Sequence, residues 1–224
     1  MANSSSYFEQ NAMYEIFSRA EDFPGKIFTY LKKEVKKKQV LDVWCGTGKY
    51  ANILASYAKC ITWIDASQDQ IRLAQAKNRE QKNTKFYQED ARNISLKENS
   101  IDVIIWCWFL PTIGDINIQT GVIKKLQKIL KPWGKILLIE NDVSGEFELI
   151  REKNKLKINP TLQYNNRLLS QWFSVVKKIK TYFLFDAIAQ AKEVFTAIWG
   201  PQKGSNVRSK KIAHDVLIFE RKKK

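Results

Sequence analysis

Hydrophobic and polar positions along the chain follow two periods, one typical of buried strands and the other of amphipathic helices. Nearly continuous apolar runs occupy residues 39–43 (QVLDV), 60–64 (CITWI), 100–109 and 134–140, and residues 84–90 (TKFYQED) are a further predicted strand. Between them, residues 49–58, 67–81 and 116–130 place apolar side chains at helical spacing. Apolar strands that alternate with amphipathic helices predict an α/β fold with a mostly parallel sheet and helices on both faces.

The two ends of the chain continue the same pattern. Residues 7–20 and 24–35 predict helices before the first strand. After residue 140, the pattern predicts helices at 145–157, 161–171 and 186–198 and strands at 175–185 and 213–222. Since no linker, repeat or low-complexity block interrupts the chain, we expect a single domain over 1–224. Its parts are a helical N-terminal cover (1–37), a core (38–142) and a C-terminal part that completes the sheet (143–224).

The composition excludes several classes of protein. Hydrophobic residues make up 44% of the chain, which is typical of a globular protein. The chain contains no apolar run of about 18 residues, and its start lacks the pattern of a secretory signal. The three cysteines and the one histidine match no metal or disulfide spacing, so we expect no metal site and a cytoplasmic location.

The net charge of +15 raises the question of a nucleic-acid partner. However, the chain has 8 arginines against 30 lysines, and arginine is the preferred side chain for reading bases and phosphates. The lysines are also dispersed along the sequence. The charge therefore favours a solvated surface, and nucleic acid is a possible partner that the sequence does not favour.

Three polar features follow predicted strands. The loop from Asp42 to Gly48 follows the first strand, Asp65 ends the second and Asp90 ends the third. Because parallel strands carry their carboxyl ends to one edge of a sheet, we expect these features to meet there and to bind a ligand that contains a ribose. Each acid also has a structural alternative: Asp65 could cap the next helix, and Asp90 could close a turn.

The motifs VLDVWCGTG, ITWIDAS and YQEDARNISL resemble the class I S-adenosylmethionine-dependent methyltransferases, in particular the small-molecule, quinone-biosynthesis-like type. The resemblance implies a Rossmann-like, doubly wound seven-stranded sheet whose antiparallel last strand lies between strands five and six. It also implies S-adenosyl-L-methionine as the cofactor. The residues expected to bind it are Asp42, Trp44, Cys45, Gly46, Thr47, Gly48, Asp65, Ala66, Asp90, Ala91 and Trp106.

The resemblance implies direct transfer of the methyl group to an acceptor, which is chiefly a matter of positioning and desolvation. The sequence identifies neither the catalytic residues nor the oligomeric state. Glu140, Asp142, Tyr7 or Tyr14 could face the acceptor, or they could be surface groups or core aromatics. The favoured function is methyl transfer to a small molecule. The alternatives are an RNA methyltransferase and, if Trp44 is genuine, a non-catalytic binding protein.

Tryptophan occupies four positions at which the family pattern has glycine: Trp44, Trp63, Trp133 and Trp172. The chain has only 9 glycines, about 4%, against the roughly 7% that is usual. Some bacteria read the codon UGA as glycine, whereas a common bacterial table reads it as tryptophan. Our hypothesis is that these four residues are glycines translated with the wrong table; the alternative is divergence with compensating changes. Trp106 and Trp108 are undecided.

Overall fold

The structure is a computed structural model, and it describes residues 12–46, 48–108, 110, 113–152, 156–171 and 173–223. Thr47, Trp172 and Tyr7 lie outside these ranges. The chain divides into two compact units whose segments alternate along the sequence. One unit comprises 28–140, 168–177 and 218–224, and is called here the loop unit because it contains the glycine loop. The other comprises 1–27, 141–167 and 178–217 and is called the aromatic unit.

Seven strands form one sheet in the order β3-β2-β1-β4-β5-β7-β6. The strands are β1 (Gln39–Val43), β2 (Cys60–Asp65), β3 (Thr84–Gln88), β4 (Ile101–Cys107), β5 (Leu130–Asn141), β6 (Ser174–Leu184) and β7 (Lys211–Lys222). Strands β1 to β5 pair in parallel. Strand β7 runs antiparallel to β5, since Asp142 N–H donates to the Asp215 carbonyl at 2.9 Å and Lys223 N–H donates to the Gly134 carbonyl at 2.8 Å. The predicted fold class is therefore confirmed, including the position of the last strand.

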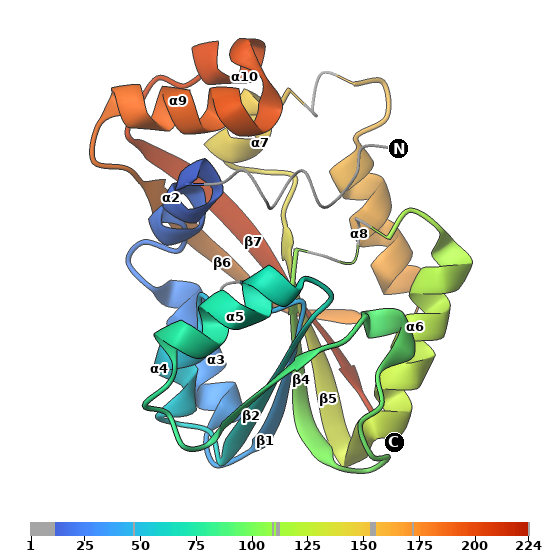
Figure 1. Cartoon of the computed structure of the whole chain (residues 1–224). Coiled ribbons are helices and arrows are strands. Elements are labelled where there is room, and N and C mark those ends of the chain that lie inside the picture. Colours follow the sequence, from blue (N-terminus) through green and yellow to red (C-terminus); the bar gives the residue numbers. More distant parts are fainter. Residues whose placement is uncertain are drawn as a thin grey trace. The chain divides into compact units, whose positions relative to one another are not determined.

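In the loop unit, apolar strands form a core that helices cover on both sides (Figure 1). Helices α3 (Lys26–Val35), α4 (Ala51–Ala55) and α5 (Gln68–Lys77) lie on one side of the strands and α6 (Ile116–Ile129) on the other. The 3-10 turn η1 (Ala91–Asn93) follows β3. Leu41, Ile104 and Leu138, on three neighbouring strands, are fully buried. This continuous apolar burial is what a parallel sheet covered on both faces requires.

The aromatic unit has a core of its own. Its elements include α2 (Ala12–Ala20), α7 (Glu146–Ile150), α9 (Ile188–Trp199) and α10 (Pro201–Ser205), and α8 (Pro160–Ser170) begins in it. Phe147, Phe183 and Phe195 are buried together, and Phe17 stacks on Phe183 with 4.7 Å between ring centroids. Aromatic side chains thus supply the apolar surface that these short helices bury.

The element boundaries depart from the sequence-based expectation at several places; for example, α4 covers only Ala51–Ala55 of the predicted helix 49–58. The predicted helix 145–157 ends at Ile150, because Glu152 has a left-handed φ of 56° that stops the helix. Strand β5 begins at Leu130 rather than at 134, and α10 was not predicted. Within the described ranges, no helix is both long and apolar enough to cross a membrane.

Candidate functional site

The glycine loop, residues 44–48, is anchored to the second strand through its backbone. The N–H groups of Trp44 and Cys45 both donate to the Ile64 carbonyl, at 2.9 and 3.1 Å. Gly46 and Gly48 have left-handed φ values of 54° and 76°, which glycine adopts without strain. The loop therefore turns back at the carboxyl end of β1, where the predicted Thr47 falls outside the described residues.

Asp65 is the last residue of β2 and fixes this loop. Its Oδ2 accepts a hydrogen bond from Gly46 N–H at 2.9 Å, and its Oδ1 accepts one from Ser67 N–H at 2.9 Å. The side chain thus joins the loop to Ser67, and Ser67 rather than Asp65 caps α5, since its hydroxyl accepts from Gln70 N–H. A carboxylate has about four acceptor positions, so two are left for a ligand such as a ribose. Ala66 follows it, and its carbonyl accepts from the Gln88 side chain at 3.3 Å.

Asp90 lies two residues beyond the end of β3 and begins η1. Its Oδ1 accepts from Arg92 N–H at 2.8 Å, and the Arg92 guanidinium pairs with both carboxylate oxygens. The hydrogen bond from the Arg92 side chain lowers the pKa of Asp90, which is therefore ionised at neutral pH. Ala91 is buried beside it. The turn-closing alternative is present, and Arg92 is a partner that the sequence analysis missed.

The carboxyl ends of β1, β2 and β3 meet at one edge of the sheet because these strands are parallel. Asp42 and Asp65 make this edge acidic and poorly hydrated, with exposed fractions of 6% and 2%. Burial raises the pKa of Asp42 well above its ordinary value, and the charge of Asp65 raises it further. Burial also raises the pKa of Asp65 and of the Cys45 thiol. A cationic ligand would relieve this concentration of negative charge.

Further side chains border the loop from the end of β4. Trp106 is buried on β4 opposite Val43. The Lys49 ammonium lies 5.7 Å from the Trp108 ring centroid and 5.3 Å from that of Tyr50. These cation–π contacts place the residues after β4 beside the residues after the glycine loop. The contact between Lys49 and Trp108 joins segments distant in sequence, and no sequence signal pointed to it.

Several tryptophans have a backbone conformation that favours glycine. Trp44 and Trp133 have left-handed φ values of 64° and 66°, and Trp108 has 52°. A side chain in this region costs about 1–2 kcal/mol relative to glycine. Trp63 differs: it lies in β2, is fully buried and shows no hydrogen-bond partner for its indole N–H among the described residues. Trp172 lies outside the described ranges.

The candidates for facing an acceptor are spread over both units. Glu140 is buried at the end of β5 in the loop unit, whereas Asp142 and Tyr14 belong to the aromatic unit. Asp142 pairs with Lys178 and accepts from Ser144 Oγ at 2.7 Å. Burial acts to raise the pKa of Asp142, but the hydrogen bonds from Lys178 and Ser144 outweigh it and lower the pKa. Asp142 is therefore a paired anion and a poor proton acceptor. Tyr7 lies outside the described residues.

Several of the known proteins to which this chain is similar are methyltransferases. A family model described as a methyltransferase domain matches residues 40–134. Demethylmenaquinone methyltransferase of Staphylococcus aureus (strain MRSA252) is 24% identical over 156 residues, which cover 62% of this chain and 64% of that protein. The putative methyltransferase YqeM of Bacillus subtilis (strain 168) is 31% identical over 118 residues, 51% of this chain and 45% of that protein. The chain thus spans less than two thirds of the length of either relative.

Solved structures show the same fold. The N-methyltransferase NodS from Bradyrhizobium japonicum, solved in complex with S-adenosyl-L-homocysteine, superimposes with a TM-score of 0.58 at 13% identity. The match covers 99% of this chain and 93% of that chain.

Proposed function

We propose that this chain, whose domain over residues 40–134 belongs to the class I methyltransferases that depend on S-adenosylmethionine, transfers the methyl group of that cofactor to a small-molecule acceptor. The observation that carries the proposal is the hydrogen bond between Asp65 and Gly46. It fixes a glycine loop and an acidic side chain together at the carboxyl ends of β1 and β2, where open α/β sheets bind their ligands.

The residues at this edge fit the chemistry of S-adenosylmethionine. The cofactor carries a sulfonium and an ammonium, and Asp42 and Asp65 supply two buried carboxylates that favour positive charge. Asp65 retains acceptor positions for the ribose hydroxyls. Asp90 and Ala91 follow β3 and are proposed to meet the adenine, where Asp90 would share its oxygens with Arg92.

When bound, the cofactor supplies an electrophilic methyl group on its sulfonium. On this proposal Asp65 would hold the ribose, and the backbone of Trp44, Cys45, Gly46 and Gly48 would hold the rest of the ligand. Asp42 and Asp65 have little contact with solvent, and electrostatic interactions are stronger where water is excluded. Since Lys178 holds Asp142 ionised and paired, we assign no general base.

The acceptor class rests on one relative. The Staphylococcus aureus protein is named for demethylmenaquinone, so an aromatic quinone precursor is the acceptor to test first. The low identity of 24% makes this relative a guide to the class of acceptor, not to its identity.

The test is calorimetric binding of S-adenosylmethionine and S-adenosyl-L-homocysteine, followed by transfer of a radiolabelled methyl group to candidate acceptors. It should use both the chain as printed and the variant Trp44→Gly. Saturable binding of both ligands, with transfer to a small molecule, supports the proposal. Absence of binding to both proteins, each shown to be folded, would sink it and would favour a non-catalytic relative.

A further inference from the structure

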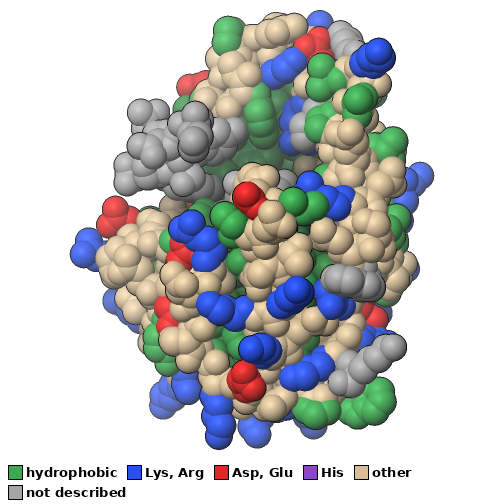
Figure 2. All heavy atoms as spheres, turned by 90° about the vertical axis from the view of Figure 1, so that its right-hand side faces the viewer, with side chains coloured by type: hydrophobic (Ala, Val, Ile, Leu, Met, Phe, Trp, Pro, Cys, Tyr) green, Lys and Arg blue, Asp and Glu red, His purple; other side chains and the backbone are tan. Residues whose placement is uncertain are grey.

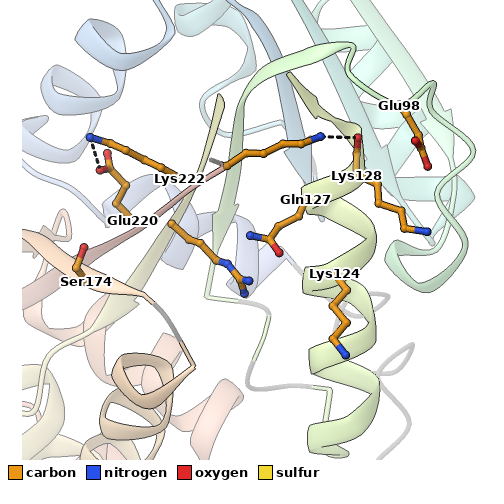
Figure 3. A pocket seen from close by; sticks show the side chains of 9 residues that line it. Glu98, Lys124, Gln127, Lys128, Ser174, Glu220 and Lys222 are labelled. Atoms are coloured by element: carbon orange, nitrogen blue, oxygen red, sulfur yellow. Dashed lines mark hydrogen bonds and ion pairs between the residues drawn. The ribbon is translucent and has the colours of Figure 1, made fainter. Parts of the chain in front are cut away.

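A groove of about 920 Å³ lies in the loop unit, away from the glycine loop. Figure 3 shows Lys124, Gln127 and Lys128 of α6 on one side of it and Ser174, Glu220 and Lys222 on the other. Lys124 and Lys128 are four residues apart on α6 and therefore share one face of the helix. The second wall consists of the start of β6 and the end of β7.

Cations outnumber carboxylates among the residues that line the groove. Five are basic and two are acidic: Lys124, Lys128, Arg221, Lys222 and Lys223 against Glu98 and Glu220. The negative charge of Glu220 is already offset by two cations, because Lys135 lies 2.9 Å and Lys222 3.4 Å from its carboxylate. Helix α6 itself contains no acidic residue. Figure 2, which faces the side of the molecule that carries α6, shows many Lys and Arg side chains and few Asp or Glu.

The cations that line the groove differ in how accessible they are to a ligand. Lys124 and Lys128 are exposed and form no ion pair within the part of the chain that the structure describes. Lys223 is held in place, since its ammonium donates to Asn99 Oδ1 at 2.8 Å and to the Leu130 carbonyl at 2.6 Å. Arg221 is partly buried, with its guanidinium 6.0 Å from the Phe173 ring centroid, and burial lowers its pKa.

The groove and the glycine loop lie at opposite ends of the strands. Lys223 pairs with Gly134 at the beginning of β5, and β5 is parallel to β4 and β1. The groove is thus at the amino ends of the strands whose carboxyl ends carry Asp42 and Asp65. A ligand bound there is separate from the methyl-transfer site.

We propose that this groove binds the phosphodiester backbone of a single-stranded nucleic acid, with Lys124, Lys128 and Arg221 as the phosphate contacts. The charge complements a polyanion, and the concave shape places cations on two facing walls, which suits a strand better than the flat surface of a bilayer. Ser174 and Gln127 add neutral hydrogen-bonding groups that can contact sugar or phosphate oxygens.

The experiment measures binding of fluorescein-labelled single-stranded RNA and DNA 20-mers of one sequence by fluorescence anisotropy, from 50 to 300 mM salt. The variant is Lys124→Gln with Lys128→Gln. Its matched control is Lys82→Gln with Lys85→Gln, which has the same net charge. Lys82 lies just before β3 and Lys85 lies on it, and β3 is the edge strand farthest from β6 in the sheet. Three phosphate contacts predict a slope of about −2 for log affinity against log salt.

We expect the control to keep this slope and the affinity of the unaltered chain. The groove variant should bind about tenfold more weakly at 50 mM salt, with a slope near −0.7 for the one remaining contact. Equal weakening in both variants would mean diffuse attraction to a basic protein and would overturn the proposal, as would no binding at 50 mM salt. Loss of binding to vesicles rich in anionic lipid, with oligonucleotide binding unchanged, would assign the groove to a membrane surface instead. Comparing the RNA and DNA arms shows whether the sugar matters.

Discussion

The carboxylate of Asp65 accepts a hydrogen bond from the backbone N–H of Gly46, with 2.9 Å between the two atoms. Its other oxygen accepts from Ser67 N–H, so one buried side chain fixes both the glycine loop and the N-terminus of α5. The shape of the loop therefore depends on a side chain from the neighbouring strand. Under the proposed function, the side chain that would meet the ribose also holds the loop in position.

Replacing Asp65 by Asn should weaken binding of S-adenosyl-L-homocysteine by about 10- to 100-fold, since hydrogen bonds to a charged group contribute roughly 1.5–3 kcal/mol. The amide removes the charge and one of the two acceptor oxygens, so one backbone N–H loses its partner. Calorimetric titration measures the affinity. A thermal melt of the same sample shows whether the protein is folded.

Asp69→Asn is the matched control for that variant. Asp69 lies four residues further along, in the first turn of α5, where it is exposed and pairs with Arg72 at 3.3 Å. We expect its affinity to stay within twofold of that of the unaltered chain. If Asp69→Asn and Asp65→Asn bound equally well, Asp65 would not contact the cofactor.

The sequence predicted most strands of the parallel sheet because they are short apolar runs, as QVLDV and CITWI illustrate, whereas TKFYQ of β3 has only two apolar residues. The position of β7 between β5 and β6 came from the family resemblance, since hydrophobic periodicity does not encode strand order. Helix α10 was missed because PQKGS has neither apolar periodicity nor sufficient length. The end of α7 was missed because it depends on the left-handed backbone at Glu152, a non-glycine residue.

Sequence reasoning also brought Asp65 and Asp90 to one edge of the sheet, but it could not foresee what each carboxylate contacts. The two backbone donors to Asp65 and the Arg92 guanidinium at Asp90 depend on side-chain rotamers and loop geometry. Spacing alone does not determine these. The assignment of these residues to cofactor binding stays a prediction.

Asp42→Asn should raise the free energy of unfolding at neutral pH. Burial and the charge of Asp65 raise the pKa of Asp42 in the folded state, so ionisation there is unfavourable. For an acid with a raised folded-state pKa, the stabilisation is present below the unfolded pKa and is lost as the pH rises through the folded value. Urea unfolding at pH 5 and pH 8 should show a smaller decrease with pH in the variant. An equal or larger decrease would contradict the assignment.

Asp142→Asn should have the opposite dependence on pH. Despite its burial, hydrogen bonds from Lys178 and Ser144 lower the pKa of Asp142. An acid with a lowered pKa stabilises the fold above the unfolded pKa, and this stabilisation is lost as the pH falls through the folded value. The variant should therefore be less stable than the unaltered chain at pH 7, by about 1 kcal/mol because Lys178 is partly exposed, and nearly equal to it at pH 2. Urea unfolding at both pH values measures the difference.

Trp133→Gly should stabilise the protein. Trp133 is 82% exposed, so its side chain contributes little burial, and its φ of 66° is a conformation that glycine adopts without strain. Relief of that strain should raise the free energy of unfolding by about 1 kcal/mol. Trp199→Gly is the control, because Trp199 lies in α9 and packs edge-on against Phe17 at 5.2 Å. That variant should be destabilised, and destabilisation of Trp133→Gly as well would show that the tryptophan makes favourable contacts.

The last prediction concerns what the native protein carries at these positions. Three of the six tryptophans that the structure describes, Trp44, Trp108 and Trp133, have left-handed φ values, a region in which tryptophan is strained and glycine is not. If UGA codons for glycine underlie the pattern, peptide mass spectrometry of protein from its native source should give glycine at all three, including the previously undecided 108. Tryptophan at 44 and UGG in the gene would contradict this hypothesis. The cofactor loop would then carry a large side chain on a strained backbone, and the binding test on the chain as printed, rather than on Trp44→Gly, would decide whether the protein is an enzyme.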